Sequence, residues 1–163
     1  MVAFPFSSSI AVGVGSNAPS DLGSAFATVS ASIPRLRFLL ATFAGLDPSR
    51  IVASQLTQTL PVGGPIDQAP YVNAVVLVPE VSRAVTAAAA LNLLDQLQSL
   101  ETAFGRDRSR EQRWGPRSLD LDLLFWGELR LEHPRLVLPH PRLHLRMFVL
   151  APLLEVMQGA DPS

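Results

Sequence analysis

The chain has 163 residues, of which 48% are hydrophobic and 17% are charged, and its net charge at pH 7 is −1. This length fits one domain with a substantial core, and the near-zero charge excludes binding of nucleic acid through the overall charge of the chain. Because there is no cysteine, disulfides, thiolate metal sites and a cysteine nucleophile are excluded. All 13 basic residues are arginine, which excludes a phosphate loop or a Schiff base that depends on lysine.

The sequence predicts a cytoplasmic protein with no membrane partner. Its Ala/Leu-rich stretch, residues 84–94, is too short to cross a bilayer. The segment 1–7 lacks the charged flank and the long apolar region of an export signal.

The first third of the chain predicts a buried strand followed by helical segments. Residues 9–15 have the pattern of a short strand. A helix follows with Ser20 or Asp21 as its N-cap, and Pro34 is expected to end or kink it. Residues 35–46 have a helical pattern again. The apolar residues at helical spacing in the first segment are Leu22, Phe26, Val29 and Ile33.

The middle of the chain predicts two strands and a long helix. Residues 51–57 and 71–78 are strand candidates, separated by a loop rich in Gly and Pro. Ser82 is the expected cap of the long helix, and Gly105 is expected to end it. The core stripe of this helix consists of Leu93, Leu97, Leu100 and Phe104.

After a charged loop at 106–117, residues 119–126 predict another strand, followed by a small hairpin after Gly127 and a short helix around 146–156. The element order is βα-β-β-α-β with additions at the C-terminal end. This order fits an α+β sandwich with a mainly antiparallel sheet and helices on one face. The regular βαβα alternation of a doubly wound parallel sheet is absent.

Asp120 and Asp122 lie one residue apart in the strand at 119–126. Residues two apart in a strand point to the same side, about 7 Å from each other, so Leu119, Leu121 and Leu123 can face a core while both carboxylates face the other way. At an effective dielectric constant of 20 the two anions repel by about 2 kcal/mol. A divalent cation removes this cost, and hard oxygen ligands favour magnesium. The alternative is a half-exposed strand with two solvated aspartates.

The charged loop contains five arginines within twelve residues. It is a solvated loop with salt bridges, an RNA-binding patch with Trp114 as a stacking platform, or a set of guanidiniums that grip polyphosphate. Only the polyphosphate reading also uses the adjacent carboxylates, and an aspartate pair would repel RNA. The five are Arg106, Arg108, Arg110, Arg113 and Arg117.

The stretch 113–124, Arg-Trp-Gly-Pro-Arg-Ser-Leu-Asp-Leu-Asp-Leu-Leu, resembles the signature of the 6-hydroxymethyl-7,8-dihydropterin pyrophosphokinases of folate biosynthesis. The resemblance extends to 15–17, 59–74, 101–106 and 139–153. It implies a ferredoxin-like α+β sandwich, a single pyrophosphokinase domain over 1–163, that transfers pyrophosphate from ATP to the pterin hydroxymethyl group and releases AMP. The implied partners are these small molecules and other folate-pathway enzymes, not nucleic acid.

The same resemblance implies a role for individual residues. Asp120 and Asp122 would hold two magnesium ions, and Arg106 and Arg117 would position the transferring group from a mobile loop. Trp114 would close over both ligands. The nucleotide site would be lined by Gln98, Glu101, Arg108, Arg117, Arg135, His140 and Arg146. The pterin pocket would be formed by Thr59, Leu60, Val62, Tyr71, Asn73 and Phe148.

Several of these roles also make chemical sense. The amide of Asn73 offers a donor and an acceptor that can read the lactam and amino edge of a pterin. Tyr71 and Phe148 offer flat faces for a planar heterocycle, with core packing as the alternative. His140 lies between two prolines and can donate to a phosphate, or it is an ordinary turn histidine. Whether a dedicated base such as Asp122 takes the proton of the hydroxymethyl group stays open.

The chain departs from the family pattern in several places, with residues 35–46 as the expected insertion. Leu60 replaces a proline, Gly64 adds a residue, and Pro141 stands where an aromatic residue is common. The loop at 106–113 has one extra residue and lacks the usual lysine. These departures allow a changed ATP affinity or a different pterin. Two other functions are a catalytically idle ferredoxin-like nucleotide-binding module and an RNA-binding domain.

Overall fold

The structure, a computed structural model, describes residues 6–60, 68–111, 116–143 and 147–160, apart from the side chains of Met147, Phe148 and Ala160. Its centre is an antiparallel sheet in the order β2-β4-β1-β5, and β3 pairs with β4 as well. The strands are β1 (Ile10–Ser16), β2 (Val52–Ala53), β3 (Thr57–Thr59), β4 (Tyr71–Val78) and β5 (Asp120–Trp126).

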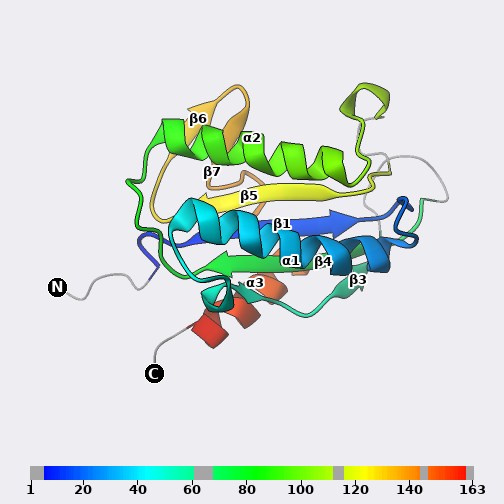
Figure 1. The fold of residues 1–163 in the computed structure, drawn as a ribbon, viewed down its shortest axis with the longest axis horizontal. Coiled ribbons are helices and arrows are strands. Elements are labelled where there is room, and N and C mark those ends of the chain that lie inside the picture. Colours follow the sequence, from blue (N-terminus) through cyan, green and yellow to red (C-terminus); the bar gives the residue numbers. More distant parts are fainter. Residues whose placement is uncertain (1–5, 61–67, 112–115, 144–146, 161–163) are drawn as a thin grey trace.

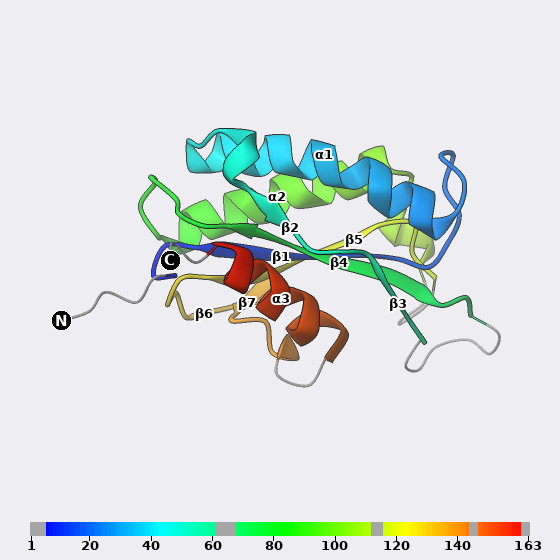
Figure 2. The ribbon, with the colours of Figure 1, turned by 90° about the horizontal axis from the view of Figure 1, so that it is seen from below.

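Helices cover both faces of this sheet. The helices α1 (Ala25–Ala44) and α2 (Ala87–Ala103) lie side by side on one face, and α3 (Met147–Ala160) lies across the other face (Figures 1 and 2). The hairpin of β6 (Leu131–His133) and β7 (Leu136–Leu138) is on the α3 side. Two short 3-10 helices, η1 (Pro48–Arg50) and η2 (Arg108–Arg110), complete the order of elements. The predicted α+β class is confirmed, and α3 adds a layer that the sequence did not indicate.

The alternation of side chains along the strands fills two cores. Val12 and Val14 of β1 and Leu121 and Leu123 of β5 are buried against α1 and α2. On the other face of the sheet, Ala11 and its neighbours pack against α3. That second core consists of Ala11, Val75, Leu77, Leu124, Val149, Leu153 and Val156.

The helix α1 continues through Pro34, so the prediction that this proline could end the helix is wrong. A proline inside a helix costs about 3 kcal/mol. Leu36 and Leu40 follow it and are fully buried, and burying each of them contributes about 1.5–3 kcal/mol, which outweighs the loss. The segment 35–46, expected as an insertion, therefore contains the second half of a single helix.

The expected caps of both long helices are also wrong. Ser24 caps α1 and accepts a hydrogen bond from the N–H of Ala27, because Ser20 is engaged with Thr28 in the preceding turn. The exposed side chains of Leu22 and Phe26 accordingly lie outside the core. Thr86 caps α2, and the predicted cap, Ser82, instead donates to the carbonyl of Ala44.

Other predicted elements are found close to their expected positions. The strand at 71–78 and the end of α2 before Gly105, which has a φ of +87°, are confirmed. The strand expected at 51–57 is divided into β2 and β3, and both pair with β4. Within the described residues, no helix is long and apolar enough to cross a membrane.

Candidate active site

The two aspartates of β5 lie opposite two glycines of β1. Asp120 pairs with Gly15 and Asp122 pairs with Gly13 in the antiparallel register. Directly opposed residues share a face of a sheet, so the strip of β1 beside the carboxylates carries no side chains. Leu119, Leu121 and Leu123 are buried on the other face, as predicted.

Gly15 also pairs with Asn73 of β4, so Asp120, Gly15 and Asn73 form one cross-strand row. Neighbouring strands are about 4.8 Å apart, which puts Asp120 and Asn73 about 10 Å from each other across the glycine. Asn73 is 6% exposed, and its Nδ2 donates to Oγ1 of Thr59 over 2.8 Å. A β-carbon added at Gly15 would lie 3.3 Å from Oδ1 of Asn73, so this amide oxygen faces the glycine.

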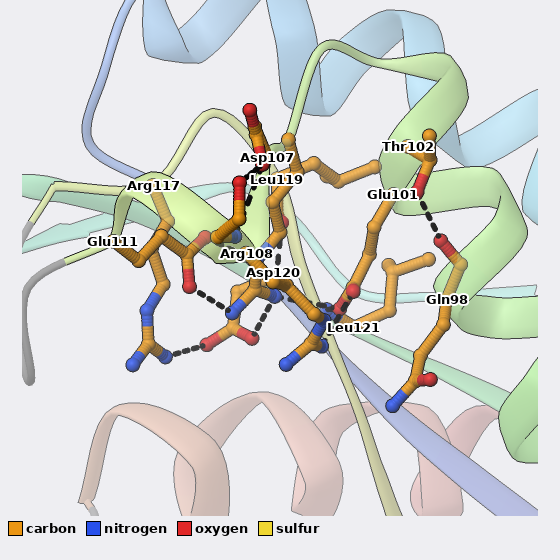
Figure 3. Close-up of polar contacts among 12 residues, drawn as sticks. Gln98, Glu101, Thr102, Asp107, Arg108, Glu111, Arg117, Leu119, Asp120 and Leu121 are labelled. Atoms are coloured by element: carbon orange, nitrogen blue, oxygen red, sulfur yellow. Dashed lines mark hydrogen bonds and ion pairs between the residues drawn. The ribbon is translucent and has the colours of Figure 1, made fainter.

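Arg106 is buried at the other end of the row and contacts three carboxylates. Its Nη1 donates to Oε1 of Glu101 over 2.8 Å and to Oδ1 of Asp120 over 2.9 Å. Its Nε and Nη2 both donate to Glu111. Glu101 also accepts the backbone N–H of Leu121, which ties the end of α2 to β5 (Figure 3).

The charges in this cluster depend on burial and on each other. Burial raises the pKa of Glu101 above its ordinary value, although hydrogen bonds from Leu121 and the charge of Arg106 act against this shift. Burial opposes the charge of Arg106, but the hydrogen bond to Glu111 and the nearby carboxylates outweigh it and raise the pKa of Arg106. Arg106 therefore stays a cation, and its donors in this structure are directed at protein carboxylates and at the carbonyl of Leu119.

Arg117 is more accessible than Arg106 and contacts the same aspartate. Its Nη1 donates to Oδ2 of Asp120 over 3.0 Å, so each oxygen of this carboxylate contacts one arginine. The Nε of Arg117 and the hydroxyl of Ser118 are buried without a hydrogen-bond partner in the part of the chain that the structure describes. Such buried polar atoms are costly unless they are paired.

Several residues expected at the nucleotide site lie along α2 or beside β5. Arg108 is half-exposed and donates to Oε2 of Glu101 over 2.6 Å. Gln98 lies almost one turn before Glu101 on α2 (Figure 3). The backbone of His140 donates to the carbonyl of Leu124 over 2.7 Å, which places this histidine beside β5. Arg135 pairs with Asp95 in the middle of α2.

The residues expected around the pterin are brought together only in part. Thr59 lies opposite Tyr71 in the pairing of β3 with β4, and Thr59 is hydrogen-bonded to Asn73. Leu60 is 79% exposed. Val62, Trp114, Arg146 and the side chain of Phe148 lie outside the described residues.

Sequence reasoning missed four residues that shape the site. Gly13 and Gly15 alternate with valines at the same two-residue spacing as the aspartates. This shared period was the signal that could have indicated the pairing of the glycines with the aspartates. Glu111 and Asn17 had only weaker signals, a charge within the arginine loop and a position in a Gly-Ser-Asn turn.

Asp120 and Asp122 are the residues that could hold magnesium together with the phosphates of a substrate. Among the described residues, no group of three or more His, Cys, Asp or Glu side chains could hold a metal ion. Magnesium in nucleotide sites commonly takes one or two carboxylates and fills its remaining positions with phosphate oxygens and water. Asp120 and Asp122, beside a glycine strip and an arginine, provide such a donor set.

Comparison with known proteins decides the family. A model of the 7,8-dihydro-6-hydroxymethylpterin-pyrophosphokinase family matches residues 11–158. The chain belongs to this family. The expected pyrophosphokinase family and its place in folate synthesis are thereby confirmed, and an idle or RNA-binding module is not favoured.

Individual members of the pyrophosphokinase family are similar over most of the chain. The 2-amino-4-hydroxy-6-hydroxymethyldihydropteridine pyrophosphokinase of Pseudomonas aeruginosa is 42% identical over 123 residues, which are 75% of this chain and 70% of the relative. The protein of the same name from Haemophilus influenzae is 42% identical over 65% of this chain and 61% of its own length. A mitochondrial folate synthesis bifunctional protein of Arabidopsis thaliana is 41% identical over 66% of this chain, but the match spans only 18% of that protein.

Proposed function

We propose that this protein, acting as one pyrophosphokinase domain over residues 1–163, transfers the terminal diphosphate of ATP to the hydroxymethyl group of 6-hydroxymethyl-7,8-dihydropterin and releases AMP. The family match and the identity of 42% to a pyrophosphokinase support the reaction. The cross-strand row carries the proposal for the site. It holds the carboxylate of Asp120 and the amide of Asn73 about 10 Å apart over a glycine, which supports assigning the first to the nucleotide and the second to the heterocycle.

On the nucleotide side, we assign Asp120 and Asp122 as the residues that would hold magnesium, with two ions expected. Bound magnesium would neutralise the phosphates and fix their orientation. Arg117 has a buried Nε without a partner in the described part of the chain, and this donor is suited to a phosphate oxygen. Arg106 would act by holding Asp120 in place, because its own donors contact Glu101, Glu111 and Asp120.

Other expected nucleotide contacts stay predictions with different support. Gln98, Arg108 and His140 lie around β5, while Arg135 is engaged with Asp95. Glu101 is 1% exposed and fully engaged, which favours a role in organising Arg106 and Arg108 over direct contact with ATP.

On the pterin side, Asn73 would read the heterocycle. Within the part of the chain that the structure describes, one N–H of its amide contacts Thr59, and the second N–H and Oδ1 suit a ligand with an amino group and a lactam. The ring of Tyr71 lies on the same face of β4, two residues away. Leu60, Val62, Trp114 and Phe148 stay predictions.

The reaction forms a bond from the hydroxymethyl oxygen to the β-phosphorus and breaks the bond from that phosphorus to the oxygen of AMP. The hydroxyl loses its proton, and AMP leaves with the bridging oxygen. Alignment of these atoms and neutralisation of phosphate charge can supply most of the rate. Arg117 would supply positive charge at the phosphates, and the row would align the two substrates. A dedicated general base is not required.

The proposal is tested with the pterin, ATP and magnesium in one assay. The protein is expected to form AMP and the pterin diphosphate in equal amounts, and Asp120→Ala or Asp122→Ala is expected to abolish both products. Glu132→Gln, which removes an exposed carboxylate from β6, is the control and should keep full activity. Nucleotide binding without AMP formation by the unaltered chain would instead indicate an idle module, and full turnover by either aspartate variant would refute the site.

Association with other folate-pathway enzymes and residence in the cytoplasm stay predictions. The bifunctional relatives from Arabidopsis thaliana and Lactococcus lactis support the first, because a pyrophosphokinase-like segment is part of a larger chain there.

A further inference from the structure

Asn17 joins two segments that enter the site from different parts of the chain. Its Oδ1 accepts the backbone N–H of Arg117 over 2.9 Å, and its own backbone N–H donates to the carbonyl of Arg117 over 3.1 Å. Its Nδ2 donates to the carbonyl of Ala69 over 3.3 Å. Asn17 is 3% exposed, so water does not replace these partners freely.

The two segments lead to opposite ends of the cross-strand row. Arg117 is three residues before Asp120 and contacts its carboxylate. Ala69 comes two residues before β4, which carries Tyr71 and Asn73. One buried amide therefore lies between the proposed nucleotide side and the proposed pterin side.

The amide uses its acceptor toward one segment and its donor toward the other. Each hydrogen bond of this kind adds about 1 kcal/mol, and a buried amide that loses a partner costs more than that. An arrangement that fits both segments is therefore favoured over one that fits only one. A bound phosphate that fixes Arg117 would therefore restrict the position of Ala69. A pterin that fixes the segment of Ala69 would in turn restrict the position of Arg117.

We propose that Asn17 is a positioning residue that couples pterin binding to nucleotide binding. The inference rests on the proposed function and adds a regulatory property of the same site. Because coupling between two sites is reciprocal, each ligand should raise the affinity for the other by the same factor. Asn17 transmits part of this factor through its bonds to Arg117 and Ala69.

The coupling is measured by titrating the hydroxymethyl pterin with and without magnesium and a nonhydrolysable ATP analogue. The ratio of the two dissociation constants is the coupling factor, and factors of about 5–150 are typical of coupled sites. In Asn17→Ala we expect this ratio to fall about tenfold. If the native ratio is below about ten, we expect the ratio in the variant to be one. The affinity for the nucleotide analogue alone should change less than about threefold. In turnover, the KM for pterin should rise more than kcat falls.

Two further variants separate positioning from folding. Asn17→Asp keeps the acceptor for Arg117 but faces the carbonyl of Ala69 with a second oxygen, so it should lose coupling as well. Ser16→Ala is the matched control, because Ser16 is fully buried beside Asn17 and, among the described residues, its hydroxyl donates to the carbonyl of Ala18. Ser16→Ala should keep the native ratio.

Each result has one interpretation. An unchanged ratio in a folded Asn17→Ala or Asn17→Asp variant overturns the inference. Equal weakening of both ligands with the ratio preserved also overturns it, because that is the result of a merely structural role. If the unaltered protein binds both ligands without any coupling, the inference fails while the proposed function stands. If it binds neither ligand, the proposed function itself fails.

Discussion

The guanidinium of Arg106 and the carboxylate of Asp120 are joined by a hydrogen bond of 2.9 Å from Nη1 to Oδ1, with the arginine side chain 3% exposed. The same guanidinium contacts Glu101 and Glu111. Arg106 therefore belongs to the support of the aspartate in this structure, whereas Arg117 lies nearer the surface with a donor to spare. The two arginines should respond differently to substitution.

Replacing Arg106 should mainly lower stability. Arg106→Met leaves Glu101 buried opposite two other carboxylates, and breaking a buried ion pair from one side costs about 3–5 kcal/mol. Arg108→Ala is the control, because Arg108 contacts the same glutamate from a half-exposed position and should cost less than about 1 kcal/mol. Urea unfolding gives both values, and a loss below about 1 kcal/mol in Arg106→Met would contradict this role.

Replacing Arg117 should mainly slow the chemical step. Removing one charged donor at a site of developing charge typically lowers the rate about 100-fold or more. We therefore expect Arg117→Ala to slow single-turnover transfer about 100-fold while the dissociation constant for pterin changes less than about threefold. Arg110→Ala, which removes an exposed arginine of the same loop, should leave the rate unchanged. A native single-turnover rate in Arg117→Ala counts against the assignment.

The two glycines of β1 offer a matched pair of substitutions. A β-carbon at Gly15 would lie 3.3 Å from Oδ1 of Asn73 and 3.7 Å from the ring of Tyr71, so Gly15→Ala should displace the amide. We expect pterin affinity to fall about tenfold, equivalent to about 1.4 kcal/mol, with nucleotide affinity kept. At Gly13 the new carbon would meet the side chain of Leu124 at 3.5 Å, an ordinary contact, so Gly13→Ala should bind pterin normally. Equal affinities in the two variants would argue against Asn73 as the pterin-reading residue.

The raised pKa of Glu101 predicts a pH dependence of stability. The cause is burial. The carboxylate of Glu101 takes up a proton at a higher pH in the folded protein than in the unfolded chain, where its pKa has the ordinary value of 4.5. As the pH falls through the raised folded value, the folded state binds more protons, so the contribution of Glu101 to stability rises; it is lost as the pH rises through that value.

The comparison of the chain with Glu101→Gln isolates this contribution. The free energy of unfolding of the unaltered chain minus that of Glu101→Gln should be larger at pH 5 than at pH 8. Glu132→Gln serves as the control for general acid effects. A difference that grows toward high pH would show that the ion pair with Arg106 outweighs burial.

Local patterns in the sequence predicted much of the fold. The run of β-branched residues at 71–78 gave β4 with its bounds, and the alternation of Leu with Asp120 and Asp122 gave the two faces of β5. The continuation of α1 through Pro34 was not predictable, because it depends on the burial of later residues against the sheet. The predicted capping sites failed because both hydroxyls are engaged elsewhere, that of Ser20 with Thr28 and that of Ser82 with the carbonyl of Ala44.

The candidate site was predictable where its residues are close in sequence. The resemblance of 113–124 to the family signature located the aspartates and Arg117. The burial of Arg106 and the cross-strand row depend on strand register and on the packing of α2 against β5, neither of which a sequence motif encodes. The bridge made by Asn17 spans 100 residues to Arg117, so the Gly-Ser-Asn turn could not indicate the partner of this residue.

β5 is an edge strand of the main sheet. An unprotected edge strand can pair with a strand of another molecule. The carboxylate of Glu101 takes the backbone N–H of Leu121 at this edge, which removes one attachment point for a foreign strand. The residue that organises the arginines thus also occupies a backbone donor that an incoming strand would otherwise use. A variant such as Glu101→Ala, which removes this acceptor, would therefore be expected to lose solubility as well.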